Sequence, residues 1–381
     1  MSLLPQFPAF QLPTETSALR AEVRQFVREA LVDQAPEERA KSWLGFDPAF
    51  TKKVADRGWI GMTWPKPYGG REMTALDRYV VVEEMVLAGA PVLAHWIADR
   101  QSGPLILRFG TEEQKEKYLP PITRGESCFA IGMSEPDAGS DLASVRTRAV
   151  RTDGGWLVNG SKIWTSNAHQ CQAMIALFRT GAADSRQAGL TQFIVDMPWP
   201  GVTVNPIVDM AGDHHFNEVV FRDCFLPDDQ LLGSEGSGWA QVTSELALER
   251  SGPERFMSSM PLLGQMIDRA AGKSTVEVAV GSLVARHTVL RQMSLSIAGQ
   301  IESGHDPQLE AACLKDLGGN LEQSVPHLAH NLLPDLPLMA QDASDYSVTL
   351  SKTMEMAPSF SIRGGAREVL RSIIARGAGL R

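Results

Sequence analysis

The sequence has few cysteines and none of the features of a membrane-spanning chain. Its cysteines, Cys128, Cys171, Cys224 and Cys313, lie far apart and form no Cys-x-x-Cys pair, so neither a zinc site nor a disulfide framework is indicated. No apolar run approaches the ~20 residues that cross a bilayer. The N-terminus lacks the basic start and apolar run of a secretory signal. We therefore expect a cytoplasmic, reducing location and no membrane span.

Positive charge is also scarce. The 36 Lys and Arg residues are outnumbered by 45 Asp and Glu residues, a net charge of -9, and no basic cluster stands out. Phosphate binding needs a concentrated basic face, so nucleic acid is not an expected partner. The pair His214-His215 has no carboxylate or cysteine at a recognised metal-ligand spacing. We therefore expect no metal site.

The hydrophobic pattern changes period twice along the 381 residues. Up to about residue 125, apolar residues recur at three- and four-residue steps, and Thr111 with Gln114 forms a helix-starting capping box that runs up to Pro120-Pro121. Alternating β-branched and aromatic residues follow, with tight-turn sequences at Asp153-Gly154 and Asn159-Gly160, the latter suited to a type I′ hairpin. Helical spacing then returns after Leu232.

This order predicts an α+β protein with three domains. We expect an N-terminal all-α domain over 1–125, a small middle β-domain over 126–232 and a C-terminal α-helical bundle over 233–381. Such a chain is long enough for two or three cores, because domains usually hold about 100 to 150 residues.

Two segments of the middle region carry a family resemblance. Residues 129–142 read FAIGMSEPDAGSDL and residues 160–168 read GSKIWTSNA. Together with RFGTEEQKEKYLP at 108–120 and the tail at 359–381, they resemble the FAD-dependent acyl-CoA dehydrogenase family along nearly the whole chain. Each segment alone also fits an ordinary loop or strand end, because Pro136, Gly139 and Ser140 are turn formers.

The resemblance implies α,β-dehydrogenation of an acyl-CoA thioester in lipid metabolism. That reaction needs a carboxylate base for the α-proton, stabilisation of the enolate oxygen and a hydride acceptor, which in the family is flavin N5. Many members carry the base in a tail pattern like Ile-Tyr-Glu-Gly-Thr, where this chain has Gly364. The long-chain and isovaleryl types instead place it in a Leu-Glu-Arg helix pattern, matched here by Glu249.

We therefore expect Glu249 to be the base, although a helical Glu beside an Arg is more often a solvated carboxylate. Gly364 would still supply a backbone N–H to the enolate oxygen and would leave space for branched acyl groups. The resemblance implies further contacts, with Ser140 reaching the substrate and Arg250 lying near the CoA end or bracing the helix. The expected flavin contacts are Met133, Ser134, Gly139, Trp164 and Ser166.

Two family features are missing. An Arg-x-x-Phe-Gly run expected near residues 271–290 is absent, and a Gly-Gly-x-Gly-Tyr run is replaced by LPLMAQDASDYSV at 336–348. Both belong to the adenosine and pyrophosphate half of the FAD site, which relatives complete with a neighbouring subunit.

Three functions therefore stay open. The first is a dehydrogenase that passes electrons to electron-transfer flavoprotein. The second is an oxygen-using relative, an acyl-CoA oxidase or flavin monooxygenase. The third is a FAD-poor subunit of a heteromeric dehydrogenase, and we expect either a homo-oligomer or a heteromer with a related subunit.

The first α-helical region also holds His95, Trp96, Asp99 and Arg100, where the family builds the floor of its acyl cavity. These residues would either read a polar acyl group or form a solvated helix end. The second alternative is favoured, because Asp and Arg usually face water.

Overall fold

The computed structural model describes residues 4–335 and 343–380. The chain forms two compact units. One comprises Met1–Thr51, Met73–Leu93 and Leu246–Arg381, and the other comprises Lys52–Glu72 and Ala94–Glu245. We call them the helical unit and the sheet unit. Helices come first, strands follow and helices return, which confirms the predicted order.

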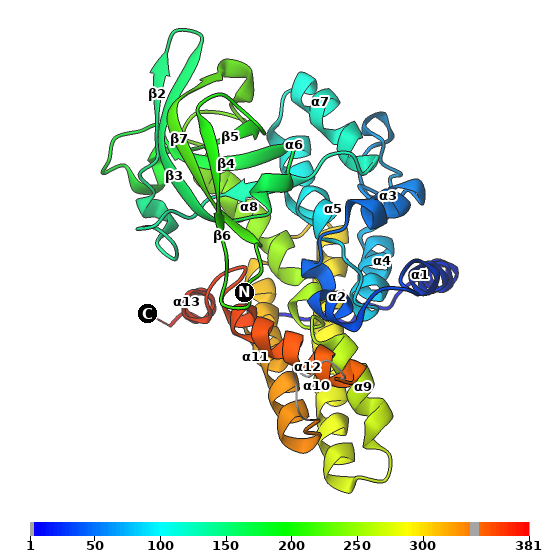
Figure 1. The fold of residues 1–381 in the computed structure, drawn as a ribbon. Coiled ribbons are helices and arrows are strands. Elements are labelled where there is room, and N and C mark those ends of the chain that lie inside the picture. Colours follow the sequence, from blue (N-terminus) through cyan, green and yellow to red (C-terminus); the bar gives the residue numbers. More distant parts are fainter. Residues whose placement is uncertain (1–3, 336–342, 381) are drawn as a thin grey trace. The chain divides into compact units, whose positions relative to one another are not determined.

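The sheet unit is built on a seven-stranded sheet (Figure 1). Its strands are β1 (Phe129–Gly132), β2 (Arg148–Thr152), β3 (Gly155–Ser166), β4 (Ala173–Arg179), β5 (Leu190–Asp196), β6 (Val202–Ile207) and β7 (Phe216–Pro227). The hydrogen-bonded order is β1-β4-β2-β3-β7-β6, and β5 pairs with β4. Every residue of β4 is buried, so its apolar run AMIALF forms the centre of the core, with the buried Arg179 at its end. Strands β3 and β7 are long and antiparallel. The resemblance segment 129–142 begins on β1, and the segment 160–168 begins on β3.

One predicted hairpin is wrong. The chain turns between β2 and β3 at Asp153-Gly154, where Gly154 has φ +71°. Asn159-Gly160 instead lies inside β3, where the register with β7 shifts between Val158 and Gly160. Gly160 takes φ +143°, and Asn159 Oδ1 accepts the Asp223 N–H at 2.9 Å. The pair therefore forms a β-bulge, in which a glycine with positive φ serves a strand irregularity and not a turn.

The sheet unit also contains short helices. They are η2 (Lys66–Tyr68), α5 (Leu93–Ile97), the π-helix η3 (Ala98–Ser102), α6 (Gly103–Phe109) and α7 (Glu112–Thr123). Short 3-10 turns between the strands are η4 (Leu142–Ser144), η5 (Ala168–Gln170) and η6 (Arg186–Gly189), and η7 (Asp228–Gln230) follows the last strand. The Thr111–Gln114 capping box is present at the start of α7. The predicted stop at Pro120 is wrong, because α7 continues through both prolines to Thr123.

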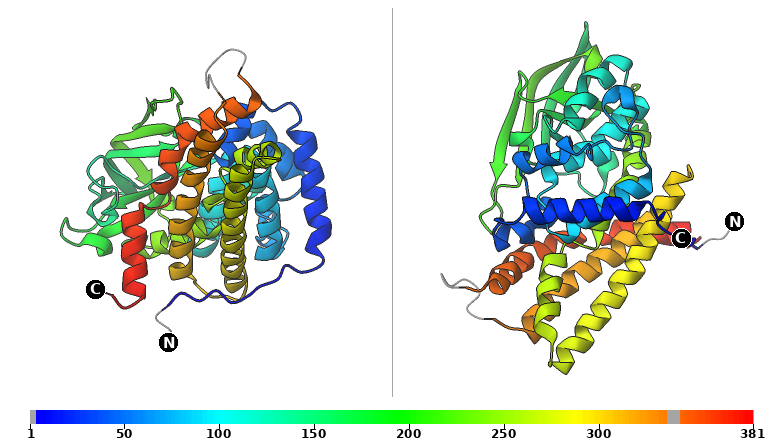
Figure 2. Two further views of the ribbon diagram at one scale, coloured as in Figure 1. Left: turned by 90° about the horizontal axis from the view of Figure 1, so that it is seen from below. Right: turned by 90° about the vertical axis from the view of Figure 1, so that its right-hand side faces the viewer.

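The helical unit is a set of packed helices. They are α1 (Thr16–Ala30), α2 (Pro36–Lys41), η1 (Ser42–Leu44), α4 (Ala75–Leu87), η8 (Pro253–Arg255), α9 (Met260–Ala270), α10 (Ser274–Glu302), α11 (Gln308–Leu332), α12 (Asp345–Met356), η9 (Ala357–Ser361) and α13 (Arg367–Gly377). The long helices α10 and α11 run side by side (Figure 2). Two further helices, α3 (Pro48–Asp56) and α8 (Gly238–Ser251), contribute residues to both units, as does α5 through its first residue, Leu93.

Buried charge joins three of these helices. Glu83 on α4 is 3% exposed, and its carboxylate pairs with Arg20 of α1 at 2.7 Å and Arg291 of α10 at 2.6 Å. Buried carboxylates are tolerated when they are paired in this way. Among the described residues, no helix is long and apolar enough to cross a membrane.

Candidate active site

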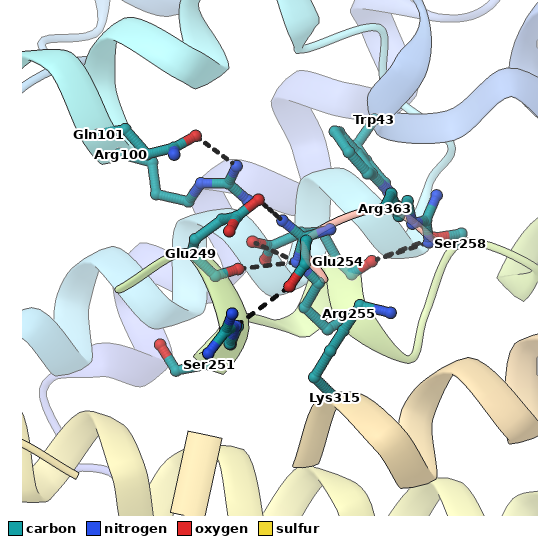
Figure 3. A network of polar contacts seen from close by, with 12 residues as sticks. Trp43, Arg100, Gln101, Glu249, Ser251, Glu254, Arg255, Ser258, Lys315 and Arg363 are labelled. Atoms are coloured by element: carbon teal, nitrogen blue, oxygen red, sulfur yellow. Dashed lines mark hydrogen bonds and ion pairs between the residues drawn. The ribbon is translucent and has the colours of Figure 1, made fainter. Parts of the chain in front are cut away.

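The expected base lies on the last turn of α8. The helix ends at Ser251 because Gly252 and Pro253 follow, and the short turn η8 brings Arg255 back against the helix end. Arg255 Nε donates to the Glu249 carbonyl at 2.7 Å, and Arg255 Nη2 donates to Glu249 Oε1 at 3.0 Å (Figure 3). The Glu249 side chain is 15% exposed and that of Arg255 is 1% exposed. Glu249 is thus a held, mostly buried carboxylate, and the solvated alternative is wrong.

The tail residue Gly364 meets the same arginine. Gly364 has φ +70° and Gly365 has φ +106°, so this short stretch has backbone that favours glycine. Arg250 Nε donates to the Gly364 carbonyl at 3.1 Å. A Cβ placed on Gly364 would lie only 3.2 Å from Arg255 Cζ. The structure therefore brings Glu249, Arg250 and Gly364 together, and Arg250 braces the helix end, one of its two expected roles.

The expected space beside Gly364 is not empty. The guanidinium of Arg255 occupies the volume next to Gly364, with both Nη atoms 3.3 Å from the position of a Cβ. The prediction that a missing side chain leaves room at this point is wrong, because a second change in sequence fills it. Arg255 follows the base by six residues, after the helix-breaking Gly252-Pro253.

A wider charged cluster surrounds this contact. We define it as the cations Arg250, Arg255, Arg363 and Lys315 with the carboxylates Glu249, Glu254 and Glu322. Arg363 Nη2 donates to Glu322 Oε2 at 2.8 Å and to Ser258 Oγ at 2.6 Å. The guanidinium carbons of Arg363 and Arg255 lie 4.8 and 5.4 Å from the ring centroid of Trp43. Cation–π contact thus supplements hydrogen bonding for both arginines.

Burial changes the titration of these cations. Burial, with the neighbouring charges of Arg255 and Arg363, lowers the pKa of Lys315 to about 7. Its Nζ donates to the Phe360 carbonyl at 2.8 Å. Burial also lowers the pKa of Arg363 to about 10, against the attraction of Glu322. Both shifts have the sign expected for cations that lose solvation.

In the sheet unit, the two resemblance segments are bonded to each other. The Ile163 N–H donates to the Ser134 carbonyl at 2.9 Å. Lys162 Nζ donates to the Met133 carbonyl at 3.1 Å and to Glu135 Oε1 at 2.7 Å. Lys162 is 0% exposed and Glu135 is 7% exposed. This buried ion pair fixes the loop after β1 against the bulged part of β3.

The Glu135 carboxylate also accepts backbone N–H groups from Arg146 at 2.6 Å and from Thr147 at 2.9 Å. Burial opposes ionisation of Glu135, but Lys162 and these hydrogen bonds hold its pKa below the usual range. Burial lowers the pKa of Lys162 to about 8, against the attraction of Glu135. We consider the pair ionised, because all these donors favour the carboxylate.

The expected flavin residues lie on the loop after β1 and on the bulged end of β3. Trp164 has φ +59° in a bulge of β3, and its ring is 56% exposed, standing edge-on to Phe216 at 5.8 Å. Ser166 ends β3 and is half-buried, as are Met133 and Ser134. Gly139 and Ser140 are exposed, and a Cβ on Gly139 would meet nothing within 4 Å. The structure thus gathers Met133, Ser134, Trp164 and Ser166 in one unit, while Glu249 and Gly364 belong to the other.

Comparison with known proteins identifies the chain. Family models for the N-terminal, middle and C-terminal domains of acyl-CoA dehydrogenase match residues 13–126, 130–224 and 236–379. The chain belongs to the acyl-CoA dehydrogenase family. It is 30% identical to the Mycobacterium tuberculosis acyl-CoA dehydrogenase FadE29 over 379 residues, covering 96% of each chain.

Two further relatives from M. tuberculosis are similar. Acyl-CoA dehydrogenase FadE34 is 34% identical over 322 residues, which are 82% of this chain but only 42% of that protein's length. The solved ChsE4-ChsE5 complex is 28% identical, with a TM-score of 0.83 over 98% of this chain and 100% of that one. These matches confirm the resemblance and the fold.

The acyl-CoA dehydrogenases are FAD-binding flavoproteins. The surface formed by the loop after β1 and the end of β3 fits such a group. It offers a solvent-facing aromatic ring at Trp164 and open space over Gly139. Beside them, the buried Thr165 Oγ1 has no hydrogen-bond partner among residues 4–335 and 343–380. A flat ring with polar atoms at its rim would pack against Trp164 and give Thr165 Oγ1 a hydrogen-bond partner. Of the two missing family runs, the first falls on α10, and residues 336–342 of the second lie outside the described residues.

Sequence reasoning missed the residues that hold the site together. Arg255 carried a signal, because the Gly252-Pro253 helix break is followed at once by a second Glu-Arg pair. Lys162 and Glu135 carried none, because they are separated by 27 residues in sequence and only the folded sheet unit joins them.

Two polar groups also differ from expectation. Asp99 and Arg100 were expected to face water but are 6% and 5% exposed in the π-helix η3, and Asp99 Oδ1 accepts the Gly61 N–H at 2.7 Å. His215 does have carboxylate companions, since ligand atoms of Asp209, Asp213 and His215 lie within 4.8 Å of one another. The His215–Asp213 contact at 3.3 Å is an ordinary loop pair, and we assign no metal to it.

Proposed function

We propose that this chain is a FAD-dependent acyl-CoA dehydrogenase in which Glu249 removes the α-proton of the thioester. The observation that carries the proposal is the contact of Glu249 and Gly364 with one guanidinium. Arg255 bonds to the Glu249 carboxylate at 3.0 Å and lies 3.3 Å from the Cβ position of Gly364. The carboxylate on α8 thus lies beside the tail position that carries the base in other members. The position that lacks the tail carboxylate and the Glu249 carboxylate that would replace it are therefore neighbours.

The surrounding groups support a base at this point. Glu249 is mostly buried, and Arg255 holds it by its carbonyl and its carboxylate. Two contacts restrict the orientation of the carboxylate. A fixed orientation favours proton abstraction, because the base need not be ordered during the reaction. Gly364 supplies a backbone N–H without a side chain, a donor suited to the enolate oxygen.

In the sheet unit, we assign flavin contacts to Met133, Ser134, Gly139, Trp164 and Ser166. FAD when bound accepts the hydride from the β-carbon. The Lys162–Glu135 pair keeps the Ser134 and Trp164 segments at fixed separation, through contacts at 2.7 and 3.1 Å. We assign Ser140, exposed beside Gly139, to the substrate.

Electron-transfer flavoprotein is the proposed acceptor, and a heteromer is the second candidate assembly. The face of α10 favours assembly, because Val278 is 75% exposed and Val289 is 60% exposed on the helix that lacks the Arg-x-x-Phe-Gly run. A similar solved structure is described as a complex of two proteins. In a heteromer, a related subunit would complete the adenosine half of the FAD site.

The test begins with the absorption spectrum and the flavin-to-chain ratio of the purified protein. Anaerobic addition of acyl-CoAs of different length and branching should bleach the flavin band with at least one member of the series. Hydrogen peroxide release in air at the rate of flavin reduction would instead identify an oxidase. Absence of bleaching with a fully loaded flavin would refute the proposed dehydrogenation.

A further inference from the structure

One nitrogen of the Arg255 guanidinium, Nη1, has no hydrogen-bond partner among the described residues. Its Nε and Nη2 are used by Glu249, at 2.7 and 3.0 Å. Nη1 is buried, and none of the residues in 4–335 and 343–380 offers it an acceptor. The whole side chain is 1% exposed. A buried cationic donor without a partner is unfavourable, so its position calls for an acceptor that binds there.

The free donor faces the side of Gly364 on which a side chain would stand. Nη1 and Nη2 both lie 3.3 Å from the Cβ position of Gly364. The same guanidinium is bonded to the Glu249 carboxylate. A ligand group on Nη1 would therefore share the arginine with the proposed base.

The charge of the cluster identifies the kind of acceptor. Four cations, Arg250, Arg255, Arg363 and Lys315, are met by three carboxylates, Glu249, Glu254 and Glu322. The adjoining carboxylate of Asp316 is already shared by Arg367 at 3.1 Å and Arg371 at 3.3 Å. The three arginines thus balance the three carboxylates, and Lys315, with its pKa lowered to about 7, adds positive charge below that pH. Burial is the main cause of that shift, followed by the neighbouring charges of Arg255 and Arg363, and an anion at Nη1 would lie among these cations.

We propose that Arg255 binds a carboxylate on the acyl group through Nη1, so that the substrates are CoA monothioesters of dicarboxylic acids. This inference rests on the proposed function, because it takes Glu249 as the base. A carboxylate is the acceptor that matches a guanidinium best. Arg255 is then a specificity-determining residue as well as the partner of the base.

The test measures binding with thioesters that cannot react. Replacing the β-carbon by sulfur removes the hydride that would be transferred, so (carboxymethylthio)acetyl-CoA reports binding alone. Its matched partners are ethylthioacetyl-CoA, with a methyl in place of the carboxylate, and the carboxamide (carbamoylmethylthio)acetyl-CoA. A second set with two more methylenes covers a longer reach. Calorimetric titration of the flavin-loaded protein gives each Kd.

We expect the carboxylate thioester of at least one set to bind roughly 10- to 100-fold more tightly than its methyl and carboxamide partners, the range for a charged hydrogen bond. Arg255→Gln should abolish this preference, so that the carboxylate and methyl thioesters bind that variant with Kd values within about 3-fold of each other. Arg255→Lys keeps the positive charge but not the paired N–H groups of the guanidinium, so it should retain only part of the preference for the carboxylate.

Equal binding of the carboxylate and methyl thioesters in both sets would overturn the inference. So would a carboxamide that binds as tightly as the carboxylate, or a preference that survives in both Arg255 variants. The comparison of ligands on the unaltered protein stands even where Arg255→Gln does not fold. Failure of the proposed function shows separately, as absence of flavin bleaching by every member of the acyl-CoA series, the all-carbon counterpart pentanedioyl-CoA included.

Discussion

Replacing Gly364 by alanine tests the packing of Arg255 against the tail. The new Cβ would lie 3.2 Å from Arg255 Cζ and 3.3 Å from both Nη atoms, closer than ordinary van der Waals contact. The backbone at φ +70° adds about 1 to 2 kcal/mol for a residue with a Cβ. Moving the guanidinium weakens its 3.0 Å bond to Glu249, a charge-assisted contact worth about 1.5 to 3 kcal/mol.

We therefore expect Gly364→Ala to lower the free energy of unfolding by roughly 2 to 4 kcal/mol, and to slow flavin reduction about 10-fold or more because the base is displaced. Urea unfolding and anaerobic stopped-flow measure the two effects. Gly264→Ala on α9 is the matched control, because a Cβ there meets nothing within 4 Å.

A double-mutant cycle isolates the contact. In an Arg255→Met background the cost of Gly364→Ala should fall by at least about 1 kcal/mol, because the clashing group is gone. Additive effects within about 0.5 kcal/mol would refute the packing argument.

Further predictions concern the buried charges and the assembly. Glu135→Gln should cost about 3 to 5 kcal/mol of stability because it leaves Lys162 buried without its counter-ion, whereas Glu126→Gln at an exposed pair should cost less than about 1 kcal/mol. Lys315 has a pKa lowered from 10.5 to about 7, so the unfolded chain holds more protons than the folded one between these values. Stability should therefore rise with pH across this window in the wild type relative to Lys315→Met, and a flat difference would contradict the shift. The chain purified alone should be at least a dimer with less than one FAD per chain, and co-expression with a related subunit should raise that ratio. Mass and flavin measured together would contradict this if they gave a monomer or one tightly held FAD per chain.

The sequence predicted the fold well because its signals are local and repeated. The change from helical to alternating periodicity near residue 126 reflects the burial of β3 and β4, and the Thr111 capping box is satisfied by contacts three residues apart. The Asn159-Gly160 prediction failed because it used a local signal alone. Positive φ at Gly160 serves a bulge as well as a turn, and only the pairing with β7 decides between them.

The candidate site was predictable only in part. The family motifs indicated Glu249 and the absent carboxylate at Gly364, but not what fills the space. That depends on Arg255, whose approach to Gly364 joins segments more than a hundred residues apart. The buried Lys162 was equally hidden, because a lysine in an alternating strand normally faces water.

The most direct test of the account is flavin reduction by Glu249→Gln. Stopped-flow mixing with the acyl-CoA that bleaches the wild type best should show a rate lower by on the order of 10²-fold or more, because the base is lost. FAD should stay bound, since its assigned contacts lie in the sheet unit. Glu368→Gln, an exposed residue of α13, is the control and should react at the wild-type rate. Near-normal bleaching by Glu249→Gln would contradict the assignment of the base.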